Sequence, residues 1–240
     1  MRYLDLADEL RTRVAGGRVG PGGALPGEVD LAEEYGTSRV TVRRALDLLR
    51  REGIVTSRRG AGWFVAVDPV RQPLGRVTTI EAAVEAAGAR PGRRVLAFGF
   101  VAAPPPVAAV LRAGPAAEVL RVERLNLADD RPFAHVVVWV RADLGADLSR
   151  ADAEHSPFYD LLPLRGVALG TVHQAISAEV ADAATAEVLD TNTGAALLVA
   201  RRVTYATDGA PVLYSEHRYP ADRTTLDIEF ALNVGAPEHV

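Results

Sequence analysis

One short segment, residues 37–46 with the sequence TSRVTVRRAL, restricts the fold of this chain more than any other. Ser38 in this segment is a natural N-cap, so the polar residues of the predicted helix gather at its exposed first turns. Apolar residues recur at the spacing of one helix face: Val42, Ala45, Leu46 and Leu49. Around the rest of the helix lie Arg39, Thr41, Arg43 and Arg44. The segment therefore predicts an amphipathic helix with a basic N-terminal end.

A basic helix end of this kind has two interpretations. Arginine pairs with guanine through two parallel hydrogen bonds or holds a phosphate, and threonine contacts either group, as in a helix that lies in the DNA major groove. Basic amphipathic helices are also common as solvated surface. The neighbouring segments decide in favour of the first interpretation.

Two further helices are predicted before the basic one. The first is expected from Leu4 to the glycine pair Gly16-Gly17, followed by a polar, glycine-rich loop. The second begins after Leu25-Pro26-Gly27-Glu28 and ends at Gly36, where a positive φ is expected. A three-residue turn then separates the second helix from the third. This is the order of a helix-turn-helix.

A hairpin is predicted after the third helix. Gly53 ends that helix, and residues 54–56 and 63–67 are typical of two strands. The tip between the strands carries Arg58, Arg59, Gly60 and Gly62. Guanidinium groups on a glycine-rich tip suit a phosphate backbone or a minor groove, so the hairpin is predicted to be a wing.

The complete pattern is specific. It consists of Leu25-Pro26-x-Glu28, Leu31-Ala32, Ser38-Arg39-x-Thr41-Val42-Arg43-x-Ala45-Leu46, Leu49, Glu52-Gly53 and Gly60-x-Gly62-x-Phe64-Val65. Residues 3–67 resemble the winged helix-turn-helix of the GntR family of bacterial transcription regulators. The resemblance implies that Arg39, Thr41 and Arg43 contact DNA, with Arg59 and Gly60 at the wing tip. The candidate DNA-binding set is Glu28, Ser38, Arg39, Thr41, Arg43, Arg44, Arg58, Arg59, Gly60 and Gly62.

Two residues depart from the family pattern. Gly27 replaces the usual serine N-cap, a loss of a few tenths of a kcal/mol that Asp30 in the first turn partly offsets. Trp63 stands where a small residue is usual.

Composition agrees with a protein of two domains. We expect a DNA-binding domain at 1–67, a linker at 68–75 and an effector-binding and dimerisation domain at 76–236, because 240 residues with 48% hydrophobic content supply two cores. The chain has no cysteine, which excludes disulfides and thiolate metal sites. No segment reaches the roughly 20 apolar residues of a membrane span, so we expect a cytoplasmic protein without a membrane partner.

Charge is distributed unevenly between the two parts. Residues 1–67 hold eleven arginines against nine carboxylates, and the remainder holds sixteen against twenty-two. The DNA-binding part is the less acidic one, but only modestly so. Specific binding is therefore expected to depend on where the arginines lie and on having two copies of the domain.

The second part mixes strands and helices. Two prolines, Pro69 and Pro73, predict the linker because they break both the helix and the strand periodicity. Strands are predicted at 94–101, 119–127, 133–141, 171–180, 197–207 and 211–219, and helices at 78–87, after 104–106, at 158–162 and at 182–189. Two hairpin turns share an acidic or glycine sequence followed by proline, which indicates an internal duplication. We expect an antiparallel sheet with packed helices.

Several short motifs in this part point to one branch of the same family. They are Arg124-Leu125, Pro132, Phe158-Tyr159-x-Leu161-Leu162, Ala186-x-x-Leu189, Gly194-x-x-Leu197-Leu198, Arg201-Arg202, Asp208-Gly209-x-Pro211 and Tyr214-Ser215-Glu216-x-x-Tyr219. They resemble the UTRA effector-binding domain of the HutC-type branch, whose fold is similar to chorismate lyase. The expected fold class is therefore α/β (α+β): an N-terminal winged helix-turn-helix joined to a chorismate-lyase-like antiparallel sheet.

The resemblance also implies a place for the ligand, between the sheet and the N-terminus of the first helix of this domain. Thr78, Thr79 and Glu81 are the candidates there. Thr78-x-x-Glu81 is equally a capping box, which needs no ligand. A carboxylate at Glu81 disfavours a phosphorylated sugar.

Arg124 matches a family position that often pairs with an acidic group of the ligand, and Asn126 shares its strand face. The set of candidates is completed by His135, Tyr159, Glu216 and Arg218. Together they suit a small polar molecule with donors, acceptors and one carboxylate. Two alternatives stay open: Glu216 forms an internal ion pair with Arg124 or Arg202, and His135 is structural.

The sequence predicts a homodimeric, ligand-responsive transcription regulator. We expect a repressor that leaves a short inverted repeat in double-stranded DNA when a small polar effector binds, without catalytic residues, cofactor or metal. One alternative is a chorismate-lyase-like enzyme domain fused to a DNA reader, although no catalytic motif is present. The other is a regulator without effector, whose second domain only dimerises. A metal site made of His135, His173 and His217 has no local spacing in its favour.

Overall fold

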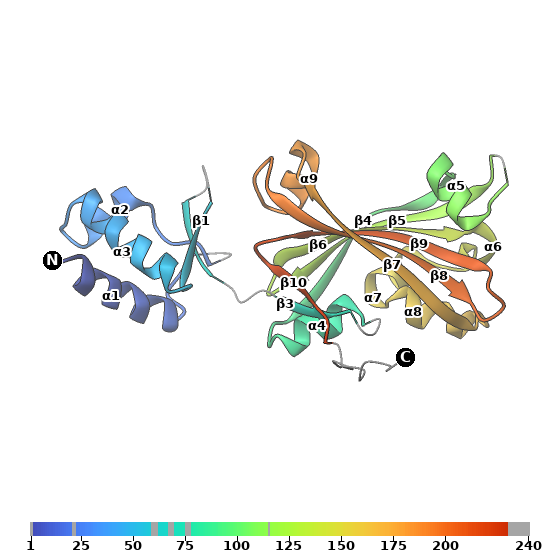
Figure 1. Cartoon of the computed structure of the whole chain (residues 1–240), viewed down its shortest axis with the longest axis horizontal. Coiled ribbons are helices and arrows are strands. Elements are labelled where there is room, and N and C mark those ends of the chain that lie inside the picture. The colour runs from blue at the N-terminus through green and yellow to red at the C-terminus, as the bar shows by residue number, and fades with distance from the viewer. Residues whose placement is uncertain are drawn as a thin grey trace, which may run out of the picture.

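The computed structural model describes residues 2–20, 23–58, 62–66, 70–74, 78–114 and 116–229. A small N-terminal part of helices and one hairpin lies beside a larger part that is organised around a six-stranded sheet (Figure 1). This is the mixed α/β architecture that the sequence predicted. Within the described ranges, no helix is long and apolar enough to cross a membrane.

The N-terminal part is a winged helix-turn-helix. Its elements are α1 (Tyr3–Ala15), α2 (Glu28–Glu34), α3 (Arg39–Arg51), β1 (Val55–Arg58) and β2 (Gly62–Val65). Gly36 has φ +57° between α2 and α3, the conformation that the turn was predicted to need. The three helices pack through leucines and valines that are fully buried: Leu6, Leu10, Leu31, Val42, Leu46 and Leu49. The buried stripe fixes which face of α3 is left for solvent.

The large sheet is antiparallel and nearly symmetric. Its strands lie in the order β4-β5-β6-β9-β8-β7, so the first three strands and the last three are mirrored about the β6–β9 pair. The bounds are β4 (Pro91–Ala102), β5 (Glu118–Ala128), β6 (Arg131–Arg141), β7 (Leu169–Val180), β8 (Ala196–Ala206) and β9 (Pro211–Pro220). Each half is a long strand followed by a hairpin, in agreement with the duplication that the two turns indicated.

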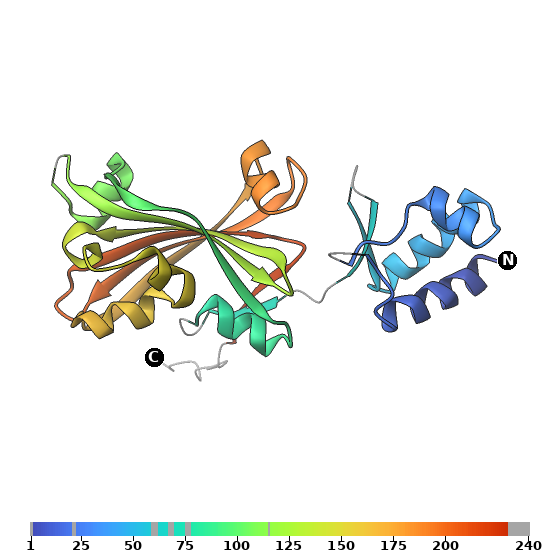
Figure 2. The ribbon, with the colours of Figure 1, turned by 180° about the vertical axis from the view of Figure 1, so that it is seen from behind.

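Helices cover both faces of this sheet (Figures 1 and 2). One face packs against α4 (Ile80–Ala86), α7 (Arg150–His155) and α8 (Phe158–Leu161), through residues such as Val136 and Val138. The other face packs against α5 (Pro105–Leu111) near one end and α9 (Ala183–Val188) near the other. A short α6 (Ala142–Gly145) and a 3-10 turn (Pro163–Arg165) complete the connections. Alternate residues of the strands therefore meet different helices.

A two-stranded sheet occupies the segment that was predicted as a linker. β3 (Val70–Pro73) pairs in parallel with β10 (Thr224–Asp227), near the end of the described chain. Arg71 adds an ion pair with Asp227 at 3.1 Å. Pro73 is compatible with a strand here because β3, one of the two strands of its sheet, is an edge strand. The linker predicted at 68–75 is therefore wrong for residues 70–73, which form a strand. The pairing partner of this strand lies more than a hundred residues away in the sequence, so no local pattern indicates it.

Candidate functional site

The start of α3 has the geometry that its sequence predicted. The Ser38 hydroxyl accepts a hydrogen bond from the Thr41 amide at 3.2 Å, so Ser38 is the N-cap. The hydroxyl groups of these two residues are also hydrogen-bonded, at 2.9 Å. Arg39, Arg43 and Arg44 are exposed on the same helix. This end of α3 therefore presents three guanidinium groups to any partner that approaches from solvent.

Arg43 is held from the side by Glu28, the first residue of α2. The Nη2 atom of Arg43 lies 2.6 Å from Oε2 of Glu28, and its Nε lies 3.1 Å from both carboxylate oxygens. The hydrogen bond with Arg43 lowers the pKa of Glu28 below its ordinary value, although partial burial opposes this. Glu28, predicted as a DNA-binding residue, has its carboxylate engaged by another member of that set.

Trp63 on β2 supports this pair. Its indole N–H donates to Oε1 of Glu28 at 3.3 Å, and its ring lies 5.9 Å from the guanidinium carbon of Arg50. Only 8% of Trp63 is exposed, because the ring packs into the core of the winged helix-turn-helix. The large residue at this position therefore has both an apolar and a polar role.

The wing tip was predicted to contact DNA. Arg58 is the last residue of β1 and Gly62 the first of β2, with φ +99°, where glycine is least strained. Arg59 and Gly60 lie outside the described residues. The two strands pair in the antiparallel register expected of a wing.

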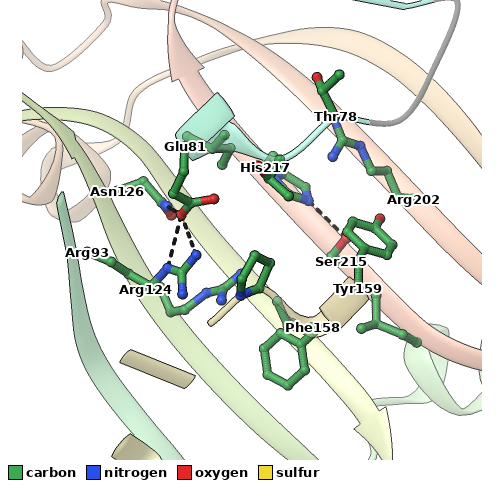
Figure 3. Close-up of a pocket in the computed structure, with 15 residues that line it drawn as sticks. Thr78, Glu81, Arg93, Arg124, Asn126, Phe158, Tyr159, Arg202, Ser215 and His217 are labelled. Atoms are coloured by element: carbon green, nitrogen blue, oxygen red, sulfur yellow. Dashed lines mark hydrogen bonds and ion pairs between the residues drawn. The ribbon is translucent and has the colours of Figure 1, made fainter. Parts of the chain in front are cut away.

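A pocket lies between the large sheet and the helices α4 and α8 (Figure 3). It encloses about 420 Å³ of empty space, its mouth included. Six of the predicted effector-binding residues line it: Thr78, Thr79, Glu81, Arg124, Asn126 and Tyr159. Residues outside the predicted set join them: Arg93, Phe158, Arg202, Ser215 and His217. The structure thus brings together side chains from both halves of the sheet.

Arg124 is the most unusual residue of the pocket. It is only 7% exposed, and among the described residues neither its Nε nor its Nη1 has a hydrogen-bond partner. Its guanidinium lies 5.0 Å from the centre of the Phe158 ring. Burial, with a smaller contribution from Arg93, lowers the pKa of Arg124 to about 9. Burial of a cation whose donors lack acceptors costs free energy, so an anion bound beside Arg124 would be stabilising.

Glu81 supplies a carboxylate to the pocket, but it is already engaged. Its Oε1 accepts from Nε of Arg93 at 3.1 Å and from Nδ2 of Asn126 at 2.8 Å. The predicted capping box with Thr78 is wrong because α4 begins one residue later. Thr79 is the N-cap, and its hydroxyl accepts from the Ala82 amide at 3.2 Å.

His217 forms part of the pocket floor. Its Nε2 is hydrogen-bonded to the Ser215 hydroxyl at 2.9 Å, and its Nδ1 lies 3.3 Å from the Tyr219 hydroxyl. Burial, followed by the charges of Arg202 and Arg124, holds the pKa of His217 well below 6.5. The imidazole is therefore neutral at physiological pH and adds no charge to the pocket.

Three predicted effector-binding residues lie on the other face of the sheet. His135, Glu216 and Arg218 do not line the pocket, because Glu216 stands between Ser215 and His217 on β9 and successive residues point to opposite faces. The β6–β9 register pairs His135 with Arg218 and so keeps these residues together. The prediction that they share one pocket with Arg124 is wrong.

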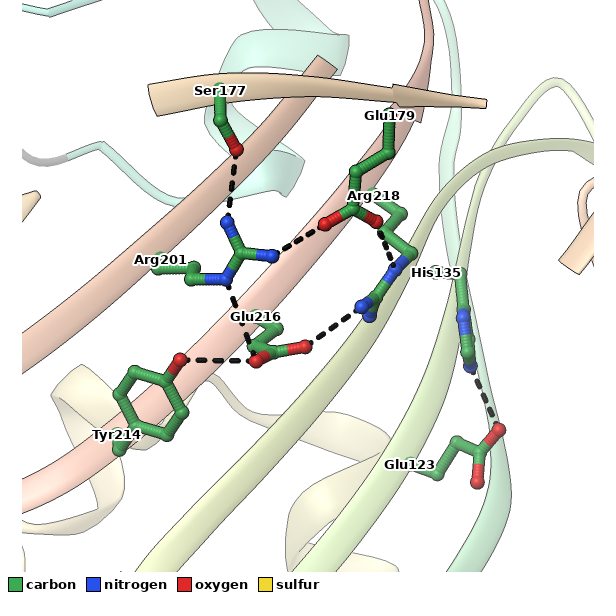
Figure 4. Close-up of polar contacts among 8 residues, drawn as sticks. All are labelled: Glu123, His135, Ser177, Glu179, Arg201, Tyr214, Glu216 and Arg218. Carbon is green, nitrogen blue, oxygen red and sulfur yellow. Dashed lines mark hydrogen bonds and ion pairs between the residues drawn. The ribbon is translucent and has the colours of Figure 1, made fainter. Parts of the chain in front are cut away.

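These residues belong to a charged cluster instead (Figure 4). The Glu216 carboxylate accepts from Nη2 of Arg218 at 2.9 Å and from the Tyr214 hydroxyl at 3.0 Å. Nε of Arg201 lies 3.6 Å from it. The internal ion pair considered from the sequence thus exists, with Arg201 and Arg218 in place of Arg124 and Arg202. His135 is hydrogen-bonded to Glu123 at 2.8 Å.

The structure gives no support to a histidine metal site. Among the described residues there is no group of three or more side chains of the kinds that hold a metal ion. His135 and His217 lie on opposite faces of the sheet.

Both parts of the chain match known families. Residues 2–65 match the family described as bacterial regulatory proteins, gntR family, and residues 86–225 match the UTRA domain. The chain belongs to the GntR family. With its UTRA domain it is a ligand-responsive, DNA-binding transcription regulator of the HutC type.

Relatives of this GntR-family regulator match along most of their length. It is 27% identical to the HTH-type transcriptional repressor NagR of Bacillus subtilis over 224 residues, 93% of this chain and 92% of that protein. It is 33% identical to the HTH-type transcriptional regulator Rv0792c of Mycobacterium tuberculosis over 220 residues, 89% of this chain and 80% of the relative. The crystal structure of PhnF from Mycobacterium smegmatis is 26% identical, with a TM-score of 0.64 over 94% of this chain and 99% of PhnF.

The sequence missed several pocket residues of this GntR-family regulator. Arg93 pairs in register with Asn126 across β4 and β5, and His217 pairs with Val136, which itself pairs with Arg124. The available signal was strand alternation, since Ser215 and His217 flank Glu216. That signal is ambiguous until the register of β6 against β9 is known.

Proposed function

We propose that this regulator is a homodimeric repressor that leaves a short inverted-repeat operator when a small carboxylate-bearing polar molecule occupies the pocket. The observation that carries the proposal is Arg124, a buried guanidinium that faces the pocket with two unpartnered donor atoms. A carboxylate is a strong, charged acceptor for guanidinium N–H groups, so a ligand that carries one can supply an acceptor to these donors.

The charge of the pocket favours the same class of molecule. Arg93 balances Glu81, whereas Nε of Arg202 is bonded to the uncharged side-chain oxygen of Gln174. Arg124 and Arg202 therefore leave the pocket positive. Phe158 offers the pocket an apolar wall. Thr78 and Tyr159 add side-chain hydroxyl groups to the lining.

The start of α3 would make the contacts to DNA bases and phosphates. Arg39 and Arg43 would contact base edges in the major groove, and Thr41 and Arg44 would contact bases or the backbone. Two copies would read the two half-sites of an inverted repeat, with dimerisation through the larger domain setting their separation.

The chain order suggests how the pocket reaches the DNA-binding part. Thr78 and Thr79 lead into α4, which follows β3, and β3 is the first strand after the wing. A ligand that draws in the start of α4 would act on the segment that positions the winged helix-turn-helix. Such a ligand changes DNA affinity only by as much as it discriminates between the two arrangements.

Titration of small carboxylates, sugar phosphates and amino-acid derivatives against operator DNA in a gel-shift assay tests the proposal. Wild type should release DNA with a carboxylate, Arg124→Ala should bind DNA normally but respond roughly ten- to a hundred-fold more weakly, and the exposed β4 variant Arg94→Ala should behave as wild type. An unchanged response of Arg124→Ala would contradict the assignment of the pocket. Turnover of the ligand would favour the enzyme alternative, and DNA binding that no ligand changes would favour a domain that only dimerises.

A further inference from the structure

We propose that Trp63 and Glu28 are positioning residues for base reading, so that the preference for guanine at one position of each operator half-site depends on both. Trp63 orients Glu28, and Glu28 orients Arg43. The inference rests on the proposed role of Arg43 in the major groove and adds a determinant that lies outside the recognition helix.

The contact between Glu28 and Arg43 leaves a defined part of the guanidinium free. A guanidinium has five N–H donors, and Glu28 takes the side that consists of Nε and Nη2. The end-on fork, made of Nη1 and the second hydrogen of Nη2, points away from the carboxylate. That fork can pair with O6 and N7 of guanine. Glu28 therefore selects which edge of Arg43 is presented.

Arg43 needs such support because of its exposure. Its side chain is 61% exposed, so an unpaired Arg43 would sample many rotamers in solution. The Glu28 side chain is only 16% exposed and comes from another helix, fifteen residues away in the sequence. Orientation before binding removes part of the entropy that is lost when a flexible side chain docks.

Trp63 fixes the Glu28 carboxylate from the side opposite to solvent. Its indole N–H donates to Oε1, and the ring is held between the core and Arg50. Arg50 is itself paired with Asp47 at 2.9 Å. Trp63 belongs to the wing strand β2, so this chain of contacts links the wing to the recognition helix. A residue that only filled the core would need no N–H aimed at an acidic side chain.

The test is selection of binding sites from a pool of random double-stranded DNA with the full-length protein. Trp63→Phe keeps an aromatic ring and removes the N–H, Glu28→Gln removes the charge, and Arg43→Ala marks the operator position that Arg43 reads. Trp139→Phe is the matched control, because Trp139 is equally buried but lies in the larger sheet. Thermal melts of each variant check that the fold is kept.

We expect Arg43→Ala to abolish the guanine preference at one position per half-site. Trp63→Phe should reduce the preference at that same position by about 3- to 10-fold, Glu28→Gln by about 10-fold or more, and neither should change the other positions. Trp139→Phe should return the wild-type motif. A purely structural role of Trp63 would lower affinity at all positions alike.

Two outcomes separate the inference from the function on which it rests. If Arg43→Ala changes the motif and Trp63→Phe and Glu28→Gln return it unchanged, the positioning role is refuted while base reading by Arg43 stands. If Arg43→Ala also returns the wild-type motif, the proposed role of Arg43 itself fails. A uniform loss of preference with Trp63→Phe would likewise overturn the inference.

Discussion

Arg124 is the seventh residue of β5, Arg202 is the seventh residue of β8, and both line the same pocket. The two strands hold equivalent places in the two halves of the sheet, on either side of the β6–β9 pair. A two-fold relation perpendicular to a sheet keeps equivalent residues on the same face. The duplication of the fold therefore gives one pocket two arginines without any local sequence motif that joins them.

Replacement of Arg124 by methionine should stabilise the protein in the absence of effector. The guanidinium is buried without an acceptor for Nε and Nη1 among the described residues, and a thioether of similar length removes that desolvation cost. We expect the free energy of unfolding to rise by about 1–3 kcal/mol, less the loss of the contact with Phe158. Thermal unfolding of both proteins without ligand measures it. A lower melting temperature for Arg124→Met would show that the cation already has a good partner.

Replacement of Arg39 by alanine should weaken operator binding by about 1–3 kcal/mol. Arg39 is exposed at the first position of α3, so the fold should be unaffected. Binding isotherms at fixed salt measure the loss, with Arg94→Ala on β4 as the control for removal of a surface charge. Full-strength binding by Arg39→Ala would remove this residue from the proposed reading surface.

Arg44 should behave differently from Arg39. If it contacts only the phosphate backbone, Arg44→Ala should weaken binding to all sequences alike and reduce the salt slope of log K by about one. Titrations at several salt concentrations, with operator and unrelated DNA, measure both effects. A loss confined to the operator would assign a base contact to Arg44 instead.

The winged helix-turn-helix was accessible from the sequence because its determinants are local. The Ser38 cap, the apolar spacing of α3 and the positive φ at Gly36 each depend on neighbours within a few residues. The bond between Arg43 and Glu28 spans two helices and was not foreseen. Trp63 stood out only as a departure from the family pattern, and its hydrogen bond to Glu28 required the structure.

In the larger domain, local sequence patterns were not sufficient to predict the pairing and the faces of the strands. Alternation predicted its strands, but the face on which Glu216 lies follows from the β6–β9 register, and a shift of one residue exchanges the faces. β3 was missed because its partner β10 comes from the other end of the chain. Of the pocket residues that were predicted, Arg124 and Asn126 lie two apart on a single strand, and Thr78, Thr79 and Glu81 lie around the start of α4.

Replacement of Glu216 by glutamine should lower stability and leave the effector response intact. The carboxylate balances Arg201 and Arg218, and both would then depend on Glu179. The cluster is partly exposed, so we expect a loss of about 1 kcal/mol in the free energy of unfolding. Denaturant unfolding and ligand-induced release of DNA are the two measurements. An effector affinity reduced as strongly as in Arg124→Ala would show that Glu216 reaches the ligand after all.

His217 should make the stability of the protein depend on pH below about 6.5. Its pKa in the folded protein is held well below 6.5 by burial and by Arg202 and Arg124, whereas the unfolded chain takes up a proton near pH 6.5. Between these values the unfolded state binds one more proton, so the free energy of unfolding falls as the pH falls, by about 1.4 kcal/mol per unit. Above pH 6.5 both states are neutral and the contribution is constant.

Urea unfolding from pH 7.5 to pH 5.0 should therefore show a loss in the free energy of unfolding that is about 2 kcal/mol larger for wild type than for His217→Gln. The exposed His155→Gln should follow wild type. Parallel pH profiles for wild type and His217→Gln would mean that His217 is protonated in the folded protein, and that another group accounts for any pH dependence.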